Sequence, residues 1–232
     1  MPPITFAHRG ARTLEPENTL AAFRRALADG AGALESDAWL SADGEVVLIH
    51  DPVARRGLRR ARVARSSAQE LQRFGVPRLA DLYDECGSDF DLSIDVKDRA
   101  AARPMVELAR GAGAPDRLWL CSASREFLGE LRTEAPDVRL VHSPGRAKVP
   151  PATFERLASD LAAAGLDALN LHHSDWTSGV VSLLHRFELR AFAWDVQEMR
   201  HLRGVLAMGI DGIYCDRVDR MLAAVGEWGA AG

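Results

Sequence analysis

Short apolar runs that alternate with longer amphipathic segments occupy the sequence from one end to the other. Such alternation predicts strands that alternate with helices and pair in parallel, which is the α/β class of fold. The runs expected to form strands are 4–8, 33–40, 46–50, 91–97, 117–122, 138–143, 168–172, 189–194 and 210–215. The segments expected to form helices include 19–29, 124–135, 154–164, 178–187, 197–208 and 218–228.

One pair of strands breaks this alternation. Only five residues separate 33–40 from 46–50, and they contain Asp43-Gly44, which is a hairpin signal. If 46–50 is the return strand of a hairpin, eight strand–helix units remain, the number that closes a (β/α)8 or TIM barrel. A doubly wound open sheet is the alternative, but it would gather polar residues at one switch point, whereas here they recur at strand ends along the chain. We therefore predict a TIM barrel with a short hairpin insertion after the second strand.

The 232 residues contain no Ser/Gly-rich linker and no low-complexity stretch, so we expect a single domain over 1–232. Apolar residues make up 47% and charged residues 27% of the chain, as in ordinary globular proteins. The net charge of -4 argues against a chain-wide preference for nucleic acid or anionic membranes. No apolar run has the length of a membrane span, so stable membrane insertion is not expected.

The compartment is predicted from the start of the chain and from its cysteines. The first residues lack a basic segment followed by a long apolar run, so no secretory signal is predicted. Cys86, Cys121 and Cys215 are odd in number, far apart and outside any CxxC pattern, which favours reduced thiols over a disulfide framework or a zinc site. We expect a cytoplasmic protein.

Two acidic residues share one face of the second predicted strand. Side chains alternate along a strand, so Glu35 and Asp37 point to the same side of an otherwise apolar run. Burying two carboxylates together is costly unless a cation lies between them, and oxygen ligands suit Ca2+ or Mg2+. An exposed strand face is the alternative interpretation.

Two histidines lie at predicted strand ends. His8 and Arg9 end the first strand, where they place a proton-transfer group beside a fixed cation, although a surface loop is equally compatible. His50 ends the hairpin return, and a hairpin centred between Asp43 and Gly44 puts His50 opposite Asp37. The pattern therefore predicts that His50 and the two carboxylates converge.

Asp95 and Lys97 share a face of the run 91–97. They form either a buried ion pair or a third metal ligand beside a donor to phosphate, and their spacing alone does not choose between these.

Two further clusters have weaker signals. The segment with Arg55, Arg56, Arg59, Arg60, Arg62 and Arg65 is interpreted as a solvated lid or loop, with a cationic lip that attracts anionic head groups as the alternative. Asn170, His172, His173 and Asp175 suggest a second metal site, which we disfavour because alternation sends His172 and His173 to opposite faces.

Taken together, these motifs resemble the glycerophosphodiester phosphodiesterase family. The resemblance rests on His8-Arg9-Gly10, Pro16-Glu17-Asn18-Thr19, Leu34-Glu35-Ser36-Asp37, Asp43-Gly44, His50-Asp51, Ile94-Asp95-Val96-Lys97, Ala193-Trp194 and 209–216. It implies a TIM barrel that hydrolyses a glycerol phosphodiester, a small-molecule substrate, to an alcohol and glycerol 3-phosphate.

The resemblance also implies roles for individual residues. Glu35, Asp37 and Asp95 would bind a divalent metal, Mg2+ or Ca2+. His8 and His50 would be the acid/base pair, Arg9 and Lys97 would contact the phosphate, and Asn18 would brace the first active-site loop. Trp194 either lines the glycerol pocket or is a core residue.

The sequence departs from the family pattern in several places. Asp95 stands where the family usually has Glu, and an Arg-rich stretch replaces a Thr-rich one after His50-Asp51. Asp195 and Gln197 replace Thr and Asn, and Cys215-Asp216-Arg217-Val218 replaces a Thr-Asp-x-Pro ending. A lysophospholipase D-like or sphingomyelinase D-like lipid phosphodiesterase, or a catalytically silent phosphodiester-binding barrel, are the alternatives.

Overall fold

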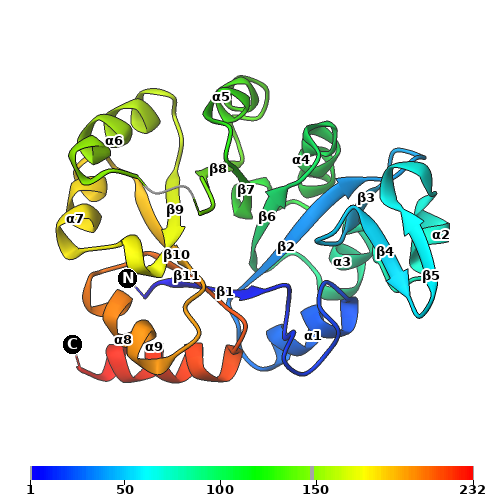
Figure 1. The fold of residues 1–232 in the computed structure, drawn as a ribbon, viewed down its shortest axis with the longest axis horizontal. Coiled ribbons are helices and arrows are strands. Elements are labelled where there is room, and N and C mark those ends of the chain that lie inside the picture. The colour runs from blue at the N-terminus through cyan, green and yellow to red at the C-terminus, as the bar shows by residue number, and fades with distance from the viewer. Residues whose placement is uncertain (1, 147–148, 232) are drawn as a thin grey trace.

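Eight parallel strands form a closed ring in the computed structural model, which describes residues 2–146 and 149–231 (Figure 1). The ring closes because the first strand pairs with both the second strand and the last. Its members, in order around the ring, are β1 (Ile4–His8), β2 (Ala33–Leu40), β6 (Asp91–Val96), β7 (Leu118–Ser122), β8 (Arg139–His142), β9 (Ala168–His172), β10 (Arg190–Trp194) and β11 (Gly212–Cys215). The predicted TIM barrel is confirmed, and the open sheet was the wrong alternative.

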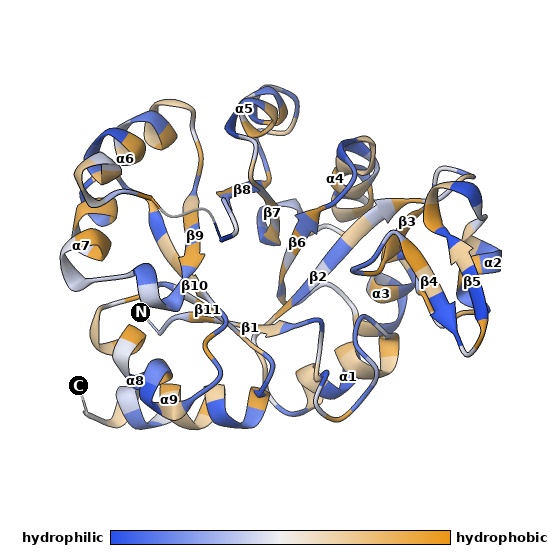
Figure 2. Ribbon diagram, viewed as in Figure 1, coloured by the Kyte–Doolittle hydropathy of each residue, from blue (hydrophilic) through white to orange (hydrophobic). Residues whose placement is uncertain are grey.

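A helix follows each strand of the ring and packs outside it (Figure 1). These helices are α1 (Leu20–Ala28), α3 (Leu79–Cys86), α4 (Ala102–Gly111), α5 (Arg125–Glu134), α6 (Phe154–Ala163), α7 (Ser178–Arg186), α8 (Met199–Ala207) and α9 (Val218–Ala231). Figure 2 shows polar and apolar residues on the same helices, as expected when one face packs on the strands. The side chain of Thr19 caps α1 and that of Ser124 caps α5. Short 3-10 helices lie at Val63–Arg65, Arg99–Ala101, Pro115–Arg117, Pro151–Thr153 and His173–Asp175.

Among the described residues, no helix has both the length and the apolar character needed to span a bilayer.

The predicted hairpin insertion is present, but its register differs by one residue from our prediction. β3 (Val46–Leu48) runs antiparallel to β2, with Leu48 opposite Ala38 and Val46 opposite Leu40. The Ser41 N–H donates to the Glu45 carbonyl, which centres the turn on Asp43. Asp37 therefore lies opposite Ile49, whose N–H donates to the Asp37 carbonyl, and the prediction that His50 faces Asp37 was wrong.

A second hairpin occupies the Arg-rich segment, which is more regular than the predicted lid or loop. β4 (Val53–Arg56) and β5 (Arg59–Arg62) pair with each other, and the short helix α2 (Ala68–Gln72) follows. Figure 1 shows this hairpin at one end of the long axis, outside the ring. A small separate apolar cluster anchors it to the barrel, and its buried members are Val47, Ala54, Ala61, Val63, Ala68, Leu71 and Val76.

The lower part of the barrel interior is filled by aromatic side chains. The Phe6 ring stacks on Tyr214 at 4.6 Å between centroids and meets Phe192 edge-on at 5.5 Å. The Trp119 ring also meets Phe192 edge-on, at 5.1 Å between centroids. Polar side chains occupy the same inward face closer to the carboxyl ends of the strands. The barrel is therefore filled by packed side chains in its interior and has a cavity at the carboxyl ends of its strands.

Gly10 is required by the turn that leads from β1 toward α1. Its φ is +77°, and a Cβ atom at this position would lie 2.7 Å from the carbonyl carbon of Ala22.

We expect Gly10→Ala to lower the free energy of unfolding by about 2–5 kcal/mol, since a left-handed conformation and a steric clash both oppose the methyl group. Urea denaturation measures this loss. Gly75→Ala is the matched control, because φ is +88° there but no described atom lies within 4 Å, and it should cost only about 1–2 kcal/mol. Equal losses in the two variants would contradict the steric argument.

Candidate active site

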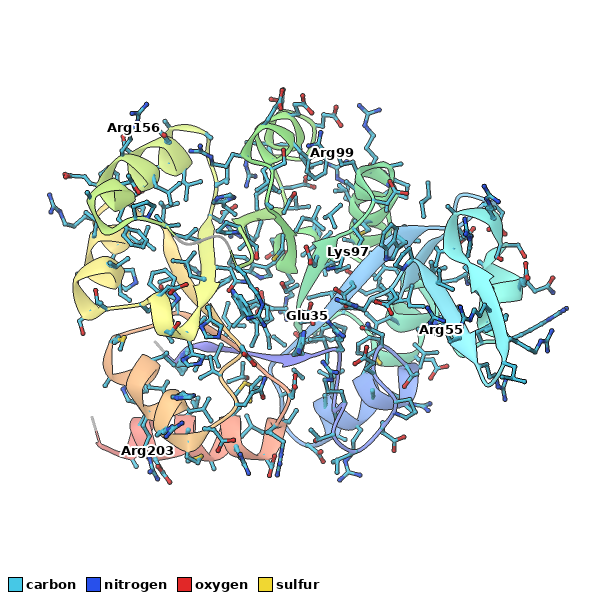
Figure 3. All side chains as sticks on the ribbon, viewed as in Figure 1. Glu35, Arg55, Lys97, Arg99, Arg156 and Arg203 are labelled. Atoms are coloured by element: carbon cyan, nitrogen blue, oxygen red, sulfur yellow. The ribbon has the colours of Figure 1, made fainter. Side chains whose placement is uncertain are left out.

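One cavity of about 520 Å³ opens at the carboxyl ends of the barrel strands. It contains all eight residues predicted from the sequence to act in catalysis, substrate binding or metal binding. Figure 3 labels two of them, Glu35 and Lys97, within the ring of strands. The lining residues are His8, Arg9, Arg12, Glu35, Asp37, His50, Ser93, Asp95, Lys97, Cys121, Ser143, Gly145, Arg146, Asn170, Trp194, Asp195, Gln197, Tyr214 and Asp216.

His8 lies between two carboxylates. Its Nδ1 is 2.6 Å from Asp216 Oδ1, and its Nε2 is 3.8 Å from Glu35 Oε2. Burial opposes the charged form, but the charges of Glu35 and Asp216 outweigh it and raise the pKa of His8. The hydrogen bond to His8 lowers the pKa of Asp216 in spite of its own partial burial. Asp216 thus fixes the orientation of the imidazole and stabilises its protonated form.

Asp216 was not predicted as a site residue. The available signal was its place immediately after the last strand of the barrel, because carboxyl ends of all eight strands meet at one face.

The two carboxylates on β2 are buried but differ in how well they are compensated. Asp37 lies near three donors, with Lys97 Nζ at 3.1 Å, Arg9 Nε at 3.2 Å and Asn18 Nδ2 at 3.2 Å. Glu35 accepts a hydrogen bond from the Arg9 N–H at 3.0 Å. Burial raises the pKa of Glu35 to about 7, and the negative charge of Asp37 adds to that rise. Glu35 therefore occupies a position where a further cation would be favourable.

The loop after β1 is held by backbone and side-chain contacts that involve Asn18. The Asn18 N–H donates to the Arg9 carbonyl at 3.1 Å, and Ser36 Oγ donates to Asn18 Oδ1 at 2.7 Å. Arg9 and Asn18 both have positive φ angles, 57° and 54°, which residues other than glycine seldom adopt. The loop is thus fixed in an unusual conformation that presents the Arg9 guanidinium to the cavity.

Lys97 joins the carboxylates of two neighbouring strands. The register of β2 and β6 puts Asp37 beside Asp95, and Lys97 Nζ lies 3.1 Å from Asp37 Oδ1 and 2.5 Å from Asp95 Oδ2. Lys97 and Asp95 thus form an ion pair, which is only partly buried because the side chain of Asp95 is 41% exposed. In the part of the chain that the structure describes, no three His, Cys, Asp or Glu side chains are arranged to hold a metal ion.

His50 lies just beyond the end of β3, on the rim of the same cavity. Its Nδ1 is 2.8 Å from Asp51 Oδ1, and its side chain is 41% exposed. The one-residue shift in the β2–β3 register does not remove His50 from the site. β3 ends at Leu48, and His50, two residues further on, still lines the cavity.

The floor of the cavity is polar but uncharged. Ser93 Oγ lies 3.0 Å from the Tyr214 hydroxyl and 3.3 Å from Cys121 Sγ. Burial raises the pKa of the Cys121 thiol to about 12, so this sulfur is not a thiolate nucleophile at neutral pH.

The wall opposite the carboxylates is formed by Trp194, Asn170 and Arg146. Trp194 Nε1 and Asn170 Oδ1 are buried and have no hydrogen-bond partner among the described residues. The Arg146 guanidinium lies 5.7 Å from the centre of the Trp194 ring. A buried donor and a buried acceptor without partners are costly in a protein interior, and such groups are usually explained by a ligand or an ordered water.

The His172–His173 pair lies next to this wall, and the prediction that the two side chains point to opposite faces was wrong. β9 ends at His172, so strand alternation no longer applies to His173, and the two rings are 4.3 Å apart. His173 also stacks on His201 at 4.2 Å.

The sequence model of the glycerophosphoryl diester phosphodiesterase family matches residues 8–220. The chain belongs to this family. It is accordingly a phosphoric diester hydrolase, and the match includes every residue of the cavity described above.

Two bacterial members of the family are similar over nearly their whole length. A glycerophosphodiester phosphodiesterase of Bacillus altitudinis is 26% identical over 93% of this chain and 95% of its own. One of Caldanaerobacter subterraneus is 24% identical over 99% of this chain and all of its own.

Solved structures of the family share the barrel. A glycerophosphodiester phosphodiesterase of Agrobacterium tumefaciens superposes with a TM-score of 0.80 at 25% identity, covering 96% of this chain and 100% of that one. A phosphodiesterase of Oleispira antarctica, solved with the product sn-glycerol-3-phosphate, has a TM-score of 0.82 at 21% identity and covers 97% of both chains.

Proposed function

We propose that this enzyme hydrolyses small glycerophosphodiesters to an alcohol and glycerol 3-phosphate, with His8 and His50 as the acid/base pair and a divalent metal as cofactor. The observation that carries the proposal is the cavity itself. It joins two histidines, the cations of Arg9 and Lys97 and a pair of buried carboxylates at one end of the barrel. The product bound by the Oleispira antarctica relative supports the same reaction.

The residues fit a divalent metal by their chemistry. Glu35 and Asp37 are buried oxygen donors on one face of β2, and burial together with the charge of Asp37 raises the pKa of Glu35 in spite of the nearby His8 and Arg9. Oxygen ligands of this kind suit Mg2+ or Ca2+. We propose that Glu35, Asp37 and Asp95 hold the ion, which would neutralise charge on the phosphate.

Arg9 and Lys97 are proposed to bind the phosphate oxygens. Both side chains line the cavity and are mostly shielded from solvent, with exposures of 14% and 24%. Electrostatic attraction is stronger in such a partly desolvated site than in water. Each cation also touches Asp37, so phosphate binding and the carboxylate pair are parts of one charge network.

The two histidines are proposed to transfer protons. His8 is held by Asp216, and His50 is held by Asp51. One imidazole accepts a proton from the attacking hydroxyl, which is either water or the neighbouring glycerol hydroxyl, and the other donates a proton to the leaving oxygen.

The glycerol moiety is proposed to bind at the wall formed by Trp194 and Asn170. A hydroxyl group can accept a hydrogen bond from Trp194 Nε1 and donate one to Asn170 Oδ1, so it would satisfy both buried atoms.

A panel of phosphodiesters assayed for release of glycerol 3-phosphate tests this assignment. We expect kcat/KM to be higher for glycerophosphocholine or glycerophosphoethanolamine than for lysophospholipid micelles, because the cavity is small and rich in charged groups. A clearly higher kcat/KM for the micelles would instead support a lysophospholipase D-like enzyme, and one for sphingomyelin a sphingomyelinase D-like enzyme.

The role of Asp95 is tested by metal titration. If Asp95 is a ligand, Asp95→Asn should raise the metal concentration for half-maximal activity by about tenfold or more, as loss of a ligand-shell group typically does. Asp95→Glu should be tolerated. Unchanged metal dependence in Asp95→Asn, together with an active Asp95→Asn, Lys97→Met double variant, would leave Asp95 as the partner of Lys97 alone.

A further inference from the structure

We propose that the hairpin β4–β5, residues 53–62, docks the enzyme reversibly on an anionic lipid surface. We call it the arginine hairpin. This proposal concerns a surface outside the cavity and does not depend on the substrate assignment.

The arginine hairpin concentrates positive charge in a chain that is otherwise acidic. The hairpin contains five arginines, and Arg65 follows it within residues 52–69, a stretch without Asp or Glu. Since the whole chain has a net charge of -4, the remainder carries -10. All six arginines are exposed. Among the described residues, none of the six has a carboxylate within 4.0 Å, whereas arginines elsewhere, such as Arg103 and Arg110, are paired.

The pairing of the two strands places like charges face to face. Arg55 lies directly opposite Arg60, and Arg56 directly opposite Arg59. Like charges in directly opposed positions destabilise a β-sheet, so these pairings oppose formation of the hairpin. Arg56 donates to the Arg73 carbonyl at 2.6 Å and Arg59 lies over the Phe74 ring, but neither contact supplies a negative charge. Features that oppose folding in this way are expected at functional surfaces. Their charges are therefore best explained by an anionic partner.

The tip of the hairpin indicates which anionic partner fits. Leu58 lies in the turn beyond the Arg56–Arg59 pair, and its exposure of 102% is the highest among the large hydrophobic residues of the described chain. Gly57 has a φ of +60° and forms the turn. An apolar tip surrounded by cations matches a lipid interface, where the leucine enters the acyl boundary and the arginines contact anionic head groups. A nucleic acid backbone would use the arginines but offer nothing to Leu58.

The hairpin lies next to the active-site entrance. A groove runs from His50 and Asp51 to Arg55 and Arg56, and His50 also lines the catalytic cavity. Figure 3 shows Arg55 on the hairpin, outside the ring that holds Glu35. Docking through the hairpin would hold the cavity mouth close to the lipid surface.

Sedimentation with vesicles tests the proposal without any turnover. We expect binding to vesicles of phosphatidylglycerol and phosphatidylcholine but not to phosphatidylcholine alone. Each arginine near an anionic surface strengthens binding by about fivefold, so R55Q/R56Q/R59Q/R60Q should weaken it by at least about a hundredfold. Leu58→Ser should weaken it by about tenfold.

The matched control removes four exposed arginines from other faces, R24Q/R117Q/R156Q/R203Q, and gives the same net charge. It should retain most of the binding, and circular dichroism should show that both quadruple variants are folded. Absence of vesicle binding by the native protein, or equal loss in the two quadruple variants, would overturn the proposal. So would a hairpin-dependent affinity for duplex DNA that exceeds vesicle binding and is indifferent to Leu58→Ser, because the partner would then be nucleic acid.

Discussion

Replacement of His8 by alanine is expected to lower kcat at least about a hundredfold, the low end of the contribution of general acid–base catalysis. The imidazole of His8 lies between the carboxylates of Glu35 and Asp216 at the end of β1, and an alanine there would leave both carboxylates without this partner. The barrel should still fold, because the side chain lies in the cavity rather than in the packed aromatic interior. Steady-state kinetics on glycerophosphocholine, with a thermal melt of the same sample, measures both quantities.

His50→Ala should behave in the same way, whereas His201→Ala provides a control. His201 lies on α8 outside the cavity, so its removal should change kcat by less than about twofold. If His8→Ala or His50→Ala turns over at a near-native rate, the histidine concerned is neither the acid nor the base.

Removal of divalent metal is expected to abolish turnover, again by at least about a hundredfold. Glu35 and Asp37 are buried on one face of β2, and a phosphodiester would bring further negative charge to them. Without a divalent ion, the cations of Arg9 and Lys97 are already engaged by Asp37 and cannot fully compensate the incoming phosphate. Protein dialysed against a chelator and assayed in metal-free buffer tests this, and titration with Mg2+ and Ca2+ separately shows which ion restores activity.

Chelator saturated with Ca2+ beforehand is the control for effects of the chelator itself. It should leave activity unchanged. Metal-stripped protein that retains full activity in excess chelator would mean that Arg9 and Lys97 alone suffice for the reaction, and that the two β2 carboxylates serve only to position them.

The fold was predictable because the hydrophobic pattern is strong along the chain. The predicted strands 4–8, 33–40 and 168–172 have the same first and last residues in the structure. Each is an apolar run bounded by Gly or polar residues, and such boundaries mark where a strand begins and ends. The register of the β2–β3 hairpin was not predictable, because the hydrogen bond between Ser41 and Glu45 sets the centre of the turn and Asp43-Gly44 allows two registers. The β4–β5 hairpin was missed because the buried residues of its strands are two alanines, Ala54 and Ala61, which give little hydrophobic signal.

The site was predictable only where one strand carries several of its residues. Glu35 and Asp37 follow from alternation along a single strand, but Asp216 acts on a residue 208 positions away, and no local pattern reveals that contact. The burial of Asn170 Oδ1 without a partner among the described residues is likewise a property of the folded barrel that no local pattern reveals. The exposure of Asp95 likewise depends on what surrounds the end of β6, which spacing does not describe.

The closure of the ring between β1 and β11 has a consequence for synthesis of the enzyme. His8 emerges from the ribosome 208 residues before Asp216, the carboxylate that orients its imidazole. Until then, β1 has no partner on one side and His8 has no fixed tautomer. A nascent chain that has not yet reached β11 therefore carries most of the polar residues of the cavity but lacks the carboxylate that holds His8, and its ring stays open on one side of β1.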